Sequence, residues 1–376
     1  MDFDIQIFHS VMEIGPTAWD QLGKGQPFTS SRWYCFGEAV FSDCSPTYVT
    51  LSQGNEPLAG SVFWVKRQEW LPIGSSIARF GAEELLRRRP LLMCAAPLAC
   101  TPGWFLPESS LRAAAVKTIS ETALEIGAKH RASFVSFSYI PEADVQQGGW
   151  PEDFSAISFT DEDTCLEISW PDFDSYLMHL AKSTRRNHRL HAKQADEMGV
   201  VVTAHSTVTD IDRAIPLIWN VERFHRAGRR PWTRSVLENA HLVDSTWITA
   251  HIGERLVGCC LVIGDGPARI ATLLGLDYSV PQYIYVYYQI IYAAIRSAIE
   301  QGAEKLYGGG GAYELKRRLG FRVLPNDYLV VAAAGKSFRW IERKLAKWAG
   351  LQNAGEKAAN ATIDPDRVTE DAPDGY

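Results

Sequence analysis

The most informative stretch of the chain is Leu306-Tyr-Gly-Gly-Gly-Gly-Ala-Tyr-Glu-Leu-Lys-Arg-Arg-Leu-Gly-Phe321. Its four consecutive glycines, 308–311, follow a short apolar run and lead into Tyr313 and Lys316. Glycine has no Cβ, so its backbone reaches unusual φ/ψ values and can approach a ligand closely, at a cost in folding entropy. The run therefore indicates a loop whose N–H groups hold a reactive carbonyl or a phosphate. A turn that only connects two elements is the alternative.

The glycine run ends the second of two similar halves. Thr47-Tyr-Val-Thr-Leu-Ser-Gln-Gly54 and Thr246-Trp-Ile-Thr-Ala-His-Ile-Gly253 are each followed by a second apolar run, which predicts a β-hairpin with its turn at the glycine. A helical pattern and a further strand follow each hairpin, at 111–126 and 133–138 in the first half and at 287–300 and 305–307 in the second. Only the second half carries the glycine loop, which favours a site there.

These repeats predict an α/β (α+β) fold of two tandem units, each with a mixed, mostly antiparallel sheet flanked by helices. The join falls in a stretch between residues 141 and 163 that is rich in Pro, Gly, Asp and Glu. We expect an N-terminal unit over residues 1–160 and a C-terminal unit with the main site over residues 161–350. Residues 351–376 contain few large apolar side chains and are expected to be disordered.

Composition is that of a soluble globular protein: 376 residues, 46% hydrophobic and 22% charged, with a net charge of −6. The negative charge gives no global attraction to nucleic acid or anionic membrane, so such contacts need local basic patches. No apolar run approaches the roughly 18 residues of a membrane-spanning helix, and no signal peptide is recognisable, so we expect a cytoplasmic protein without stable membrane insertion. Seven cysteines without a C-x-x-C indicate neither a zinc site nor a disulfide framework.

Two segments supply local positive charge. The segment 176–199 is nearly polar all round beyond Leu180, so a buried core does not explain it. The segment 222–234 mixes five arginines with Phe224 and Trp232. Arginine donates two parallel hydrogen bonds to phosphate or carboxylate and stacks on flat rings. Both segments are therefore candidates for binding phosphate or an RNA backbone. A solvated basic face and a plain surface loop are the alternatives.

A third region is rich in tyrosine, from Tyr278 to Tyr288, and begins beside Asp277. Asp277 ends a strand-like run and is a candidate base for an amine nucleophile, with a loop cap as the alternative. His188 and His191 have no carboxylate at ligand spacing, so no metal site is predicted. The sequence contains no G-x-S-x-G, no G-x-G-x-x-G after a strand and no Walker loop, which disfavours hydrolases, nicotinamide-dependent enzymes and nucleotide hydrolysis.

The order of these motifs from Tyr176 to Phe321 resembles the Fem-like branch of the GNAT acyltransferase superfamily. Lys182-Ser-Thr-Arg-Arg-Asn-His-Arg189 is similar to the Lys/Arg-Thr-Arg-x-Asn helix of that branch, and the tyrosine-rich helix with Lys316 and Gly320-Phe321 is similar to its closing motif. Tandem GNAT-like units are also typical of the branch. The resemblance implies transfer of an acyl group to an amine with formation of an amide.

For the Fem type the resemblance implies an aminoacyl-tRNA as donor, a peptidoglycan precursor or small natural product as amine-bearing acceptor, and no cofactor. Ordinary GNAT enzymes use acyl-CoA, whose pyrophosphate binds a Gln/Arg-x-x-Gly-x-Gly/Ala loop at a helix start. Tyr278-Ser-Val-Pro-Gln-Tyr-Ile-Tyr285 stands at that place and does not match it. An acyl-CoA-dependent N-acyltransferase and a non-catalytic GNAT-like binding module remain the alternatives.

Transfer from an activated ester requires a positioned neutral amine and stabilisation of the developing oxyanion. The residues predicted to stabilise charge or take a proton are Lys316, Tyr313 and Asp277. The residues predicted to bind substrate through cations, rings or backbone N–H groups are Arg185, Arg186, Arg223, Arg226, Trp232, Tyr285, Gly308, Gly309, Gly310 and Gly311.

Overall fold

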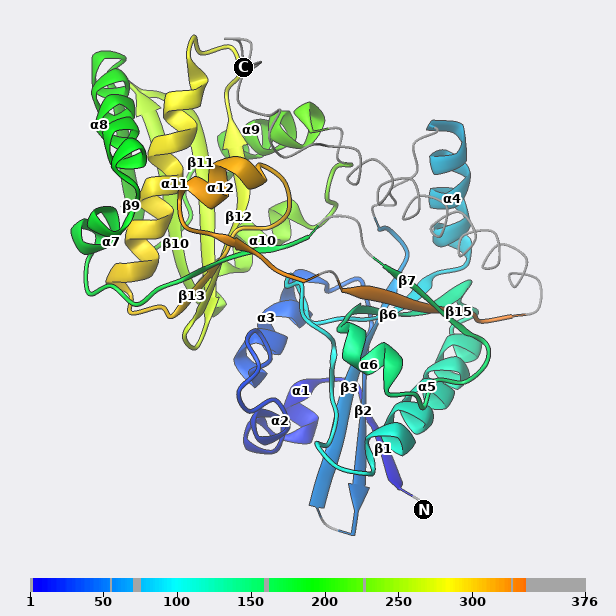
Figure 1. The fold of residues 1–376 in the computed structure, drawn as a ribbon. Coiled ribbons are helices and arrows are strands. Elements are labelled where there is room, and N and C mark those ends of the chain that lie inside the picture. The colour runs from blue at the N-terminus through cyan, green and yellow to red at the C-terminus, as the bar shows by residue number, and fades with distance from the viewer. Residues whose placement is uncertain are drawn as a thin grey trace, which may run out of the picture.

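The computed structural model describes residues 3–54, 56–69, 76–158, 162–225, 228–325 and 327–335. The chain forms two sheets with their own helices, which lie side by side (Figure 1). The tail expected to be disordered, residues 351–376, lies outside the described residues. No described helix has the length and apolar character needed to cross a membrane.

The first sheet contains strands β1 (Asp4–Phe8), β2 (Pro46–Gln53), β3 (Glu56–Lys66), β4 (Leu91–Cys94), β5 (Trp104–Phe105), β6 (Phe134–Ile140), β7 (Phe154–Ser158) and β15 (Tyr328–Ala333). Its unit has helices α1 (Val11–Ile14), α2 (Pro16–Leu22), α3 (Ser31–Val40), α4 (Ser76–Arg88), α5 (Arg112–Lys129) and α6 (Glu142–Gln146).

The second sheet contains strands β8 (Thr164–Glu167), β9 (Val200–His205), β10 (Asp244–Ile252), β11 (Arg255–Asp265), β12 (Ala268–Leu276), β13 (Lys305–Tyr307) and β14 (Arg322–Val323). Its unit has helices α7 (Phe173–His179), α8 (Lys182–Glu197), α9 (Ile211–Phe224), α10 (Thr233–Asn239), the 3-10 turn η1 (Ala240–Leu242), α11 (Tyr283–Glu300) and α12 (Tyr313–Arg318).

The two sheets have the same strand order. It is β1-β2-β3-β4-β6-β15-β7 in the first and β9-β10-β11-β12-β13-β8-β14 in the second. Among the described strands, one pair in each sheet is parallel, β4 with β6 and β12 with β13, and the others are antiparallel. This confirms the predicted tandem fold and its mostly antiparallel sheets.

Both predicted hairpins are present, as β2–β3 and β10–β11. Their turns contain Gly54 at φ +64° and Gly253 at φ +59°, a left-handed conformation that glycine adopts without steric penalty. The segment 176–199 is divided between the end of α7 and α8. The chain leaves helical geometry at Leu180, where ψ is 158°, and α8 starts at Lys182.

Strand β15 departs from the expected domain division. Its residues, 328–333, fall inside the range 161–350 assigned to the C-terminal unit, yet the strand pairs with β6 and β7 of the first sheet. In the second sheet β8 takes the equivalent place, between the parallel pair and the last strand. The chain therefore crosses between the sheets twice, before β8 and after β14. A single cut near residue 160 does not separate the two sheets.

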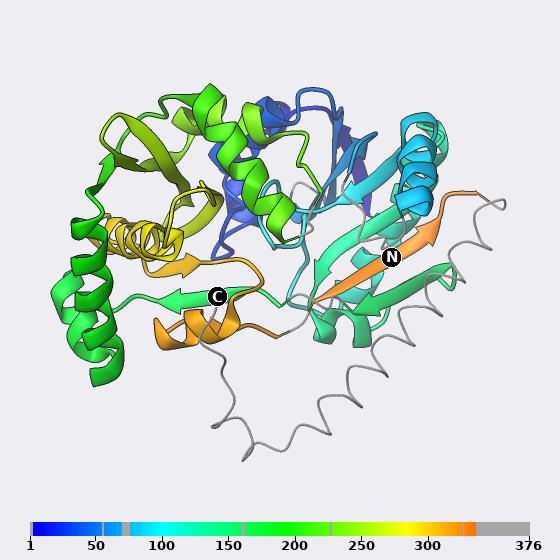
Figure 2. The same cartoon turned by 90° about the horizontal axis from the view of Figure 1, so that it is seen from above.

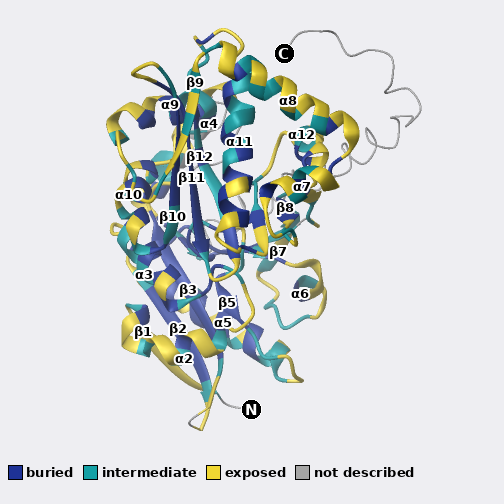
Figure 3. Ribbon diagram, turned by 90° about the vertical axis from the view of Figure 1, so that its left-hand side faces the viewer, coloured by how far each residue is buried: buried dark blue, intermediate teal, exposed yellow. Residues whose placement is uncertain are grey.

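Helices α9 and α11 cover opposite faces of the second sheet. On β11, Cys259, Leu261 and Ile263 pack with the α9 side, whereas Cys260 and Val262 pack with the α11 side. This alternation is what a strand buried on both faces requires. The central strands are accordingly buried along most of their length (Figure 3).

The α9 side of the second sheet belongs to the same apolar core as helices α1–α3 of the first unit. Aromatic rings cross the junction: Phe28 lies 5.4 Å from Tyr307 and Phe41 lies 6.3 Å from Trp232, between ring centroids. Figure 2 shows these N-terminal helices, in blue, beside the green helices of the second unit. An apolar interface of this kind fixes two units relative to each other.

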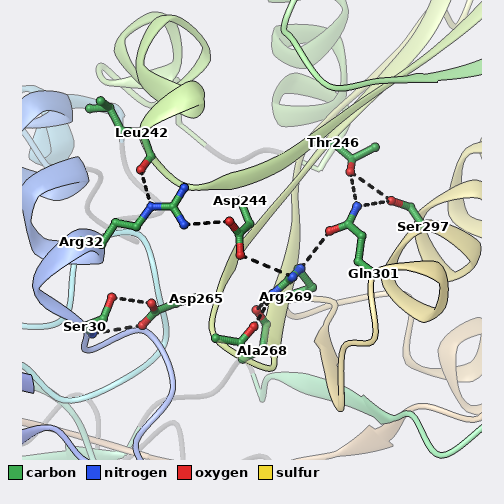
Figure 4. Close-up of polar contacts among 11 residues, drawn as sticks. Ser30, Arg32, Leu242, Asp244, Thr246, Asp265, Ala268, Arg269, Ser297 and Gln301 are labelled. Carbon is green, nitrogen blue, oxygen red and sulfur yellow. Dashed lines mark hydrogen bonds and ion pairs between the residues drawn. The ribbon is translucent and has the colours of Figure 1, made fainter.

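Polar contacts at the same junction are centred on two carboxylates (Figure 4). Asp265, at the end of β11, accepts hydrogen bonds from Thr29 N (2.9 Å), Ser30 N (3.1 Å) and the Ser30 hydroxyl, so it sits at the N-terminus of α3. A negative charge at this end of a helix is stabilised by the free N–H groups and the helix dipole. Asp244 lies 2.8 Å from Arg32 Nη1 and 3.6 Å from Arg269 Nη2.

We expect Asp265→Ala to lower the free energy of unfolding by about 2 kcal/mol, because three donors at the junction lose their acceptor. The measurement is the urea midpoint followed by tryptophan fluorescence. Asp212→Ala is the matched control, since Asp212 is 88% exposed and pairs only with a surface arginine, which predicts a change below about 0.5 kcal/mol. Equal midpoints for the two variants would contradict the assigned role of Asp265.

Candidate functional site

The parallel strands β12 and β13 diverge after a short paired stretch. They pair only over 268–270 and 305–307, after which β13 ends and β12 continues to Leu276. Within the described residues, no strand pairs with this side of β12 beyond Ile270. A bulge opposite Cys259–Leu261 and the positive φ of buried Leu273 (+49°) further distort this part of β12. Its backbone edge is thus available beside the carboxyl ends of both strands, where open sheets commonly bind ligands.

The glycine loop follows directly from the end of β13. Gly309 and Gly311 have φ of +73° and +77°, which glycine adopts far more readily than other residues. Gly308 is needed for a different reason: a Cβ there would lie 2.9 Å from Thr164 Oγ1 and 3.1 Å from the Phe321 ring. Sequence and geometry therefore agree that the loop is an ordered, closely packed element and not a linker.

Lys316 is buried under this loop, with 8% of its surface exposed. Its Nζ donates to the carbonyl oxygens of Gly308 (2.9 Å), Gly309 (2.8 Å) and Gly310 (3.2 Å), which uses all three hydrogens of the ammonium. Burial lowers the pKa of Lys316 to about 8, and nearby Asp163 opposes this shift. The contacts describe a lysine that shapes the loop; direct contact with an oxyanion stays a prediction and requires release of one of these bonds.

The inward carbonyls determine where the loop amides point. In a trans peptide the C=O of one residue and the N–H of the next point in opposite directions. With three carbonyls turned to Lys316, the N–H groups of Gly309, Gly310 and Gly311 point away from it. The Gly309 N–H donates to Asp163, which leaves those of Gly310 and Gly311, both exposed residues, as donors for a substrate oxygen.

The crossing segment before β8 holds the loop from the other side. Thr164 O accepts from Gly308 N and its Oγ1 donates to Gly309 O, both at 2.8 Å. The Tyr313 hydroxyl donates to Glu162 O at 3.0 Å, so this predicted catalytic residue is anchored to the same segment. The predicted group Gly308–Gly311, Tyr313 and Lys316 is therefore one spatial cluster, built where the chain passes between the two sheets.

Two carboxyls lie on the two crossing segments, Asp163 before β8 and Asp327 before β15, and their charges interact. Burial raises the pKa of Asp163, although hydrogen bonds from Thr164 N–H and the charge of Lys316 oppose the shift. Burial and the negative charge of Asp163 raise the pKa of Asp327 to about 6. Asp327 therefore changes its protonation state near pH 6.

Asp277 is poorly suited to the role of base. Burial acts to raise its pKa, but hydrogen bonds from Ser279 N (3.0 Å) and Oγ (2.7 Å) and the contact with Arg255 outweigh burial and hold the pKa below its ordinary value. A carboxylate with a lowered pKa is a weaker proton acceptor. These contacts describe the loop cap that was the alternative reading, and a role as base stays an untested prediction.

The predicted substrate-binding side chains lie at separate places. Arg185 Nη1 donates to Met178 O (2.9 Å) and Leu180 O (2.6 Å), so it caps the end of α7. Arg186 on α8 and Arg223 on α9 are exposed, and Arg226 lies outside the described residues. Trp232 is half-buried at the junction of the units.

Tyr285 belongs to a row of rings between α8 and α11. His191 stacks on Tyr288 with 3.7 Å between centroids and lies 5.8 Å from Tyr285. Burial lowers the pKa of His191, with the neighbouring His188 contributing, so the stacked ring is neutral near pH 7. The positive charge of Arg318 on α12 partly opposes the burial that raises the pKa of Tyr288. The row of rings therefore lies between the basic helix α8 and helix α12, which follows the glycine loop.

Sequence reasoning missed Glu222. It is 6% exposed on α9 and continues the buried stripe of Ile215 and Ile218. Burial raises its pKa, and Arg230 only partly opposes the shift. The available signal was a carboxylate on the apolar face of an amphipathic helix, at the seven-residue spacing from Ile215.

The surface hollow beside η1 lies elsewhere. It measures about 460 Å³ and is lined by Ser206, His241, Val243, Asp244, Ser245, Arg269 and Gln301. None of the predicted site residues lines it. Asp244, Arg269 and Gln301 take part in the junction network of Figure 4, so we assign this hollow to the contact between the units. No group of metal-ligating side chains is found in the described parts of the chain.

We expect Lys316→Met to lower the free energy of unfolding by about 2–3 kcal/mol, because three carbonyls around a buried cation lose their donor. Thermal and urea unfolding measure this change. Lys117→Met is the control: Lys117 is 64% exposed and its ion pair with Glu121 is long, at 3.9 Å, so its loss is worth below about 0.5 kcal/mol. Equal stability of the two variants would refute the supporting role of Lys316.

We expect Asp327→Asn to stabilise the protein at neutral pH. The folded pKa of Asp327 is about 6, above its ordinary 3.8. The folded state therefore holds the proton more tightly, and the contribution of Asp327 to stability is lost as pH rises through 6. The melting temperature of the variant should exceed that of the wild type at about pH 7.5, and the difference should vanish at about pH 4. A pH-independent difference would argue against the shift.

Comparison with known proteins agrees with this geometry. Residues 182–317 match the family model of the acetyltransferase (GNAT) domain, from the start of α8 into α12. No curated protein sequence matches the chain.

Among solved structures, a tandem GNAT protein from the clavulanic acid biosynthesis pathway, without AcCoA, aligns over 89% of this chain and 99% of its own, with a TM-score of 0.55 and 11% identity. FemX aligns over 87% and 97%, with a TM-score of 0.56 and 10% identity. The C-terminal domain of a putative lysylphosphatidylglycerol synthetase from Agrobacterium fabrum aligns over 89% and 96%, with a TM-score of 0.50 and 9% identity.

At these identities the solved structures establish the fold, while the family model identifies the part of the chain that contains the glycine loop and the diverging strands. Residues 182–317 therefore match the acetyltransferase (GNAT) domain, and the whole chain has the fold of the tandem GNAT protein and of FemX, in agreement with the Fem-like resemblance.

Proposed function

We propose that this protein is an amide-forming acyltransferase that takes an aminoacyl group from aminoacyl-tRNA and transfers it to an amine of a small natural product or cell-wall precursor. The GNAT domain and the tandem fold support acyl transfer. The finer choice of an RNA-borne donor is supported by the surroundings of helix α11.

The observation that carries this choice is the way the chain enters α11. In acyl-CoA enzymes of the superfamily, as the resemblance implies, N–H groups at this helix start bind the pyrophosphate. Here Pro281 has no N–H, and the amides of Ser279, Val280, Tyr283 and Tyr285 all donate to groups within 277–282. The ring of Tyr278 fills the space beside them, stacked on Phe224 at 4.6 Å. Few donors remain for a diphosphate.

The neighbouring face of α8 and α11 has the composition of an RNA-binding surface. Lys182, Arg186 and Arg189 are exposed on α8 and form no ion pair among the described residues. The stacked rings of His191 and Tyr288 lie between α8 and α11. Uncompensated cations that attract a phosphate backbone, next to flat rings on which bases stack, are the combination used to bind single-stranded nucleic acid. The free 3′ end of a charged tRNA has this chemistry.

The reaction then needs little beyond positioning. The neutral amine attacks the ester carbonyl carbon, a C–N bond forms, the C–O bond to the ribose breaks, and the ribose oxygen takes a proton. The exposed amides of Gly310 and Gly311 are the proposed donors to the oxyanion, with Lys316 holding them in place. Tyr313 keeps the loop attached to the crossing segment.

An acyl-CoA-dependent N-acyltransferase is the second candidate, because the matched family model is that of an acetyltransferase domain. A non-catalytic binding module is the third, and it would show no transfer from either donor.

We expect transfer of a radiolabelled aminoacyl group from charged tRNA to a pool of amine acceptors, and loss of this transfer after RNase treatment. Arg186→Glu combined with Arg189→Glu should raise KM for charged tRNA about tenfold or more and flatten its salt dependence, because phosphate contacts are removed. Lys117→Glu with Lys129→Glu, two exposed lysines on α5, is the matched charge control. RNase-resistant transfer from acyl-CoA would establish the second candidate in place of the first.

A further inference from the structure

Helix α9 ends its buried stripe with a carboxylate. Ile215, Ile218 and Glu222 are 6%, 1% and 6% exposed and share one face of the helix. This face packs closely on β12: a Cβ on Gly275 would lie 2.9 Å from Ile218 N. Asn220 Nδ2 also donates to Leu276 O at 3.3 Å. Glu222 therefore lies one helical turn beyond this contact, near the carboxyl end of the strand whose edge is unpaired.

Within the described residues, neither carboxylate oxygen of Glu222 forms a hydrogen bond of ordinary geometry. The backbone N–H of Arg230 nevertheless lies close enough to favour the charged form of the carboxylate. The nearest cation is Arg230, whose Nε lies 3.9 Å from Oε1. The guanidinium of Arg230 also faces the Trp232 ring at 5.5 Å, and that of Arg229 lies over the Trp219 ring at 4.2 Å. Both neighbouring cations are thus directed at rings and not into a hydrogen bond with the carboxylate.

The other shielded carboxylates of the chain are satisfied. Glu38 accepts from Ser10, Val11 and the Tyr48 hydroxyl. Asp144 accepts from Arg112 at 2.6 Å. Among the described residues, Glu222 is the one carboxylate whose buried oxygens make no hydrogen bond of ordinary geometry; its ion pair with Arg230 is long, at 3.9 Å. A buried polar group whose hydrogen bonds are not made costs free energy, and native proteins keep such groups chiefly where a ligand or a reaction uses them.

The chemistry of the surroundings specifies the ligand. A buried carboxylate whose oxygens lack hydrogen bonds of ordinary geometry suits a ligand group with N–H donors. An amino group can donate to both oxygens. The open edge of β12 beside it provides room for the acyl donor.

We infer that Glu222 is the amine subsite, where the acceptor's amino group binds and where the attacking nitrogen leaves its proton. This assignment rests on the proposed function for its second part, the proton transfer. As the C–N bond forms, one N–H proton passes to the carboxylate; as the ester C–O bond breaks, the ribose oxygen takes a proton, and the carboxylate can return the one it received. Atoms and charge then balance without a further reactant. The pKa of Glu222, raised by burial, brings the group closer to the range in which a base works at neutral pH.

The central experiment compares Glu222→Gln with Glu238→Gln, an exposed glutamate on α10. Glu222→Gln should lower kcat/KM for amide formation about 100-fold or more, the usual effect of losing a general base. Glu222→Asp, which keeps the charge, should recover part of the rate and shift the acidic limb of the pH profile. Glu238→Gln should change neither. A kcat/KM of Glu222→Gln within about threefold of the wild type would overturn the proton-transfer role.

Stability separates this role from a merely structural one. Because the folded pKa of Glu222 lies above its ordinary 4.5, its contribution to stability is lost as pH rises through the folded value. Glu222→Gln should therefore melt at the same or a higher temperature than the wild type at about pH 7.5, with the difference vanishing at about pH 4. If Glu222 served only as the ion-pair partner of Arg230, the variant would melt lower at about pH 7.5, and that result would overturn the assignment.

Amine binding is tested without any acyl donor. In a concentration series, n-butylamine should raise the melting temperature of the wild type, while n-butanol should not, and neither should affect Glu222→Gln. An amine response without transfer from charged tRNA or acyl-CoA would refute the proposed function and leave the amine subsite standing. Transfer in a wild type that shows no amine response would refute the subsite alone.

Discussion

The shared apolar core is the interaction on which the rest of this structure depends. Helices α1–α3 of the first unit and α9, α10, β11 and β12 of the second bury their side chains in one continuous cluster. Asp265 ties the N-terminus of α3 to β11 inside the same contact. Because the interface is apolar and aromatic, it holds the two sheets in one arrangement. Because the sheets are held in one arrangement, the segments that cross between them can pack closely against the rest of the protein.

The glycine loop is built on these crossings. Thr164 and Glu162 precede β8, Asp327 precedes β15, and the loop is bonded to the first of these segments. Lys316 donates hydrogen bonds to three loop carbonyls, so these carbonyls point inward and the amides of Gly310 and Gly311 point outward.

Local patterns predicted most of the fold, and they failed where distant segments meet. The hairpins at Gly54 and Gly253 and the helix expected over 287–300 follow from alternation and periodicity, which are properties of short windows. The return of β15 to the first sheet does not, because its apolar residues fit either sheet and only tertiary packing selects one. The same limit applies to the site. The glycine run and Lys316 predicted the position of the loop from sequence. The three carbonyl contacts of Lys316 and the hydrogen bonds that lower the pKa of Asp277 depend on the three-dimensional structure.

Helix α9 contributes both to the shared apolar core and to the proposed amine subsite. Its inward residues Ile215 and Ile218 belong to the shared core, and one turn later the same face presents Glu222, whose oxygens make no hydrogen bond of ordinary geometry. The favourable packing at one end of the helix fixes its axis, so the carboxylate at the other end cannot rotate to solvent without withdrawing apolar surface from the core. A rigid, large interface can thus hold a buried carboxylate in place with its hydrogen bonds unmade, and its oxygens are then available to an amine. On this argument the tandem arrangement serves to pre-organise the second unit, and loosening the junction should impair the site before it unfolds the chain.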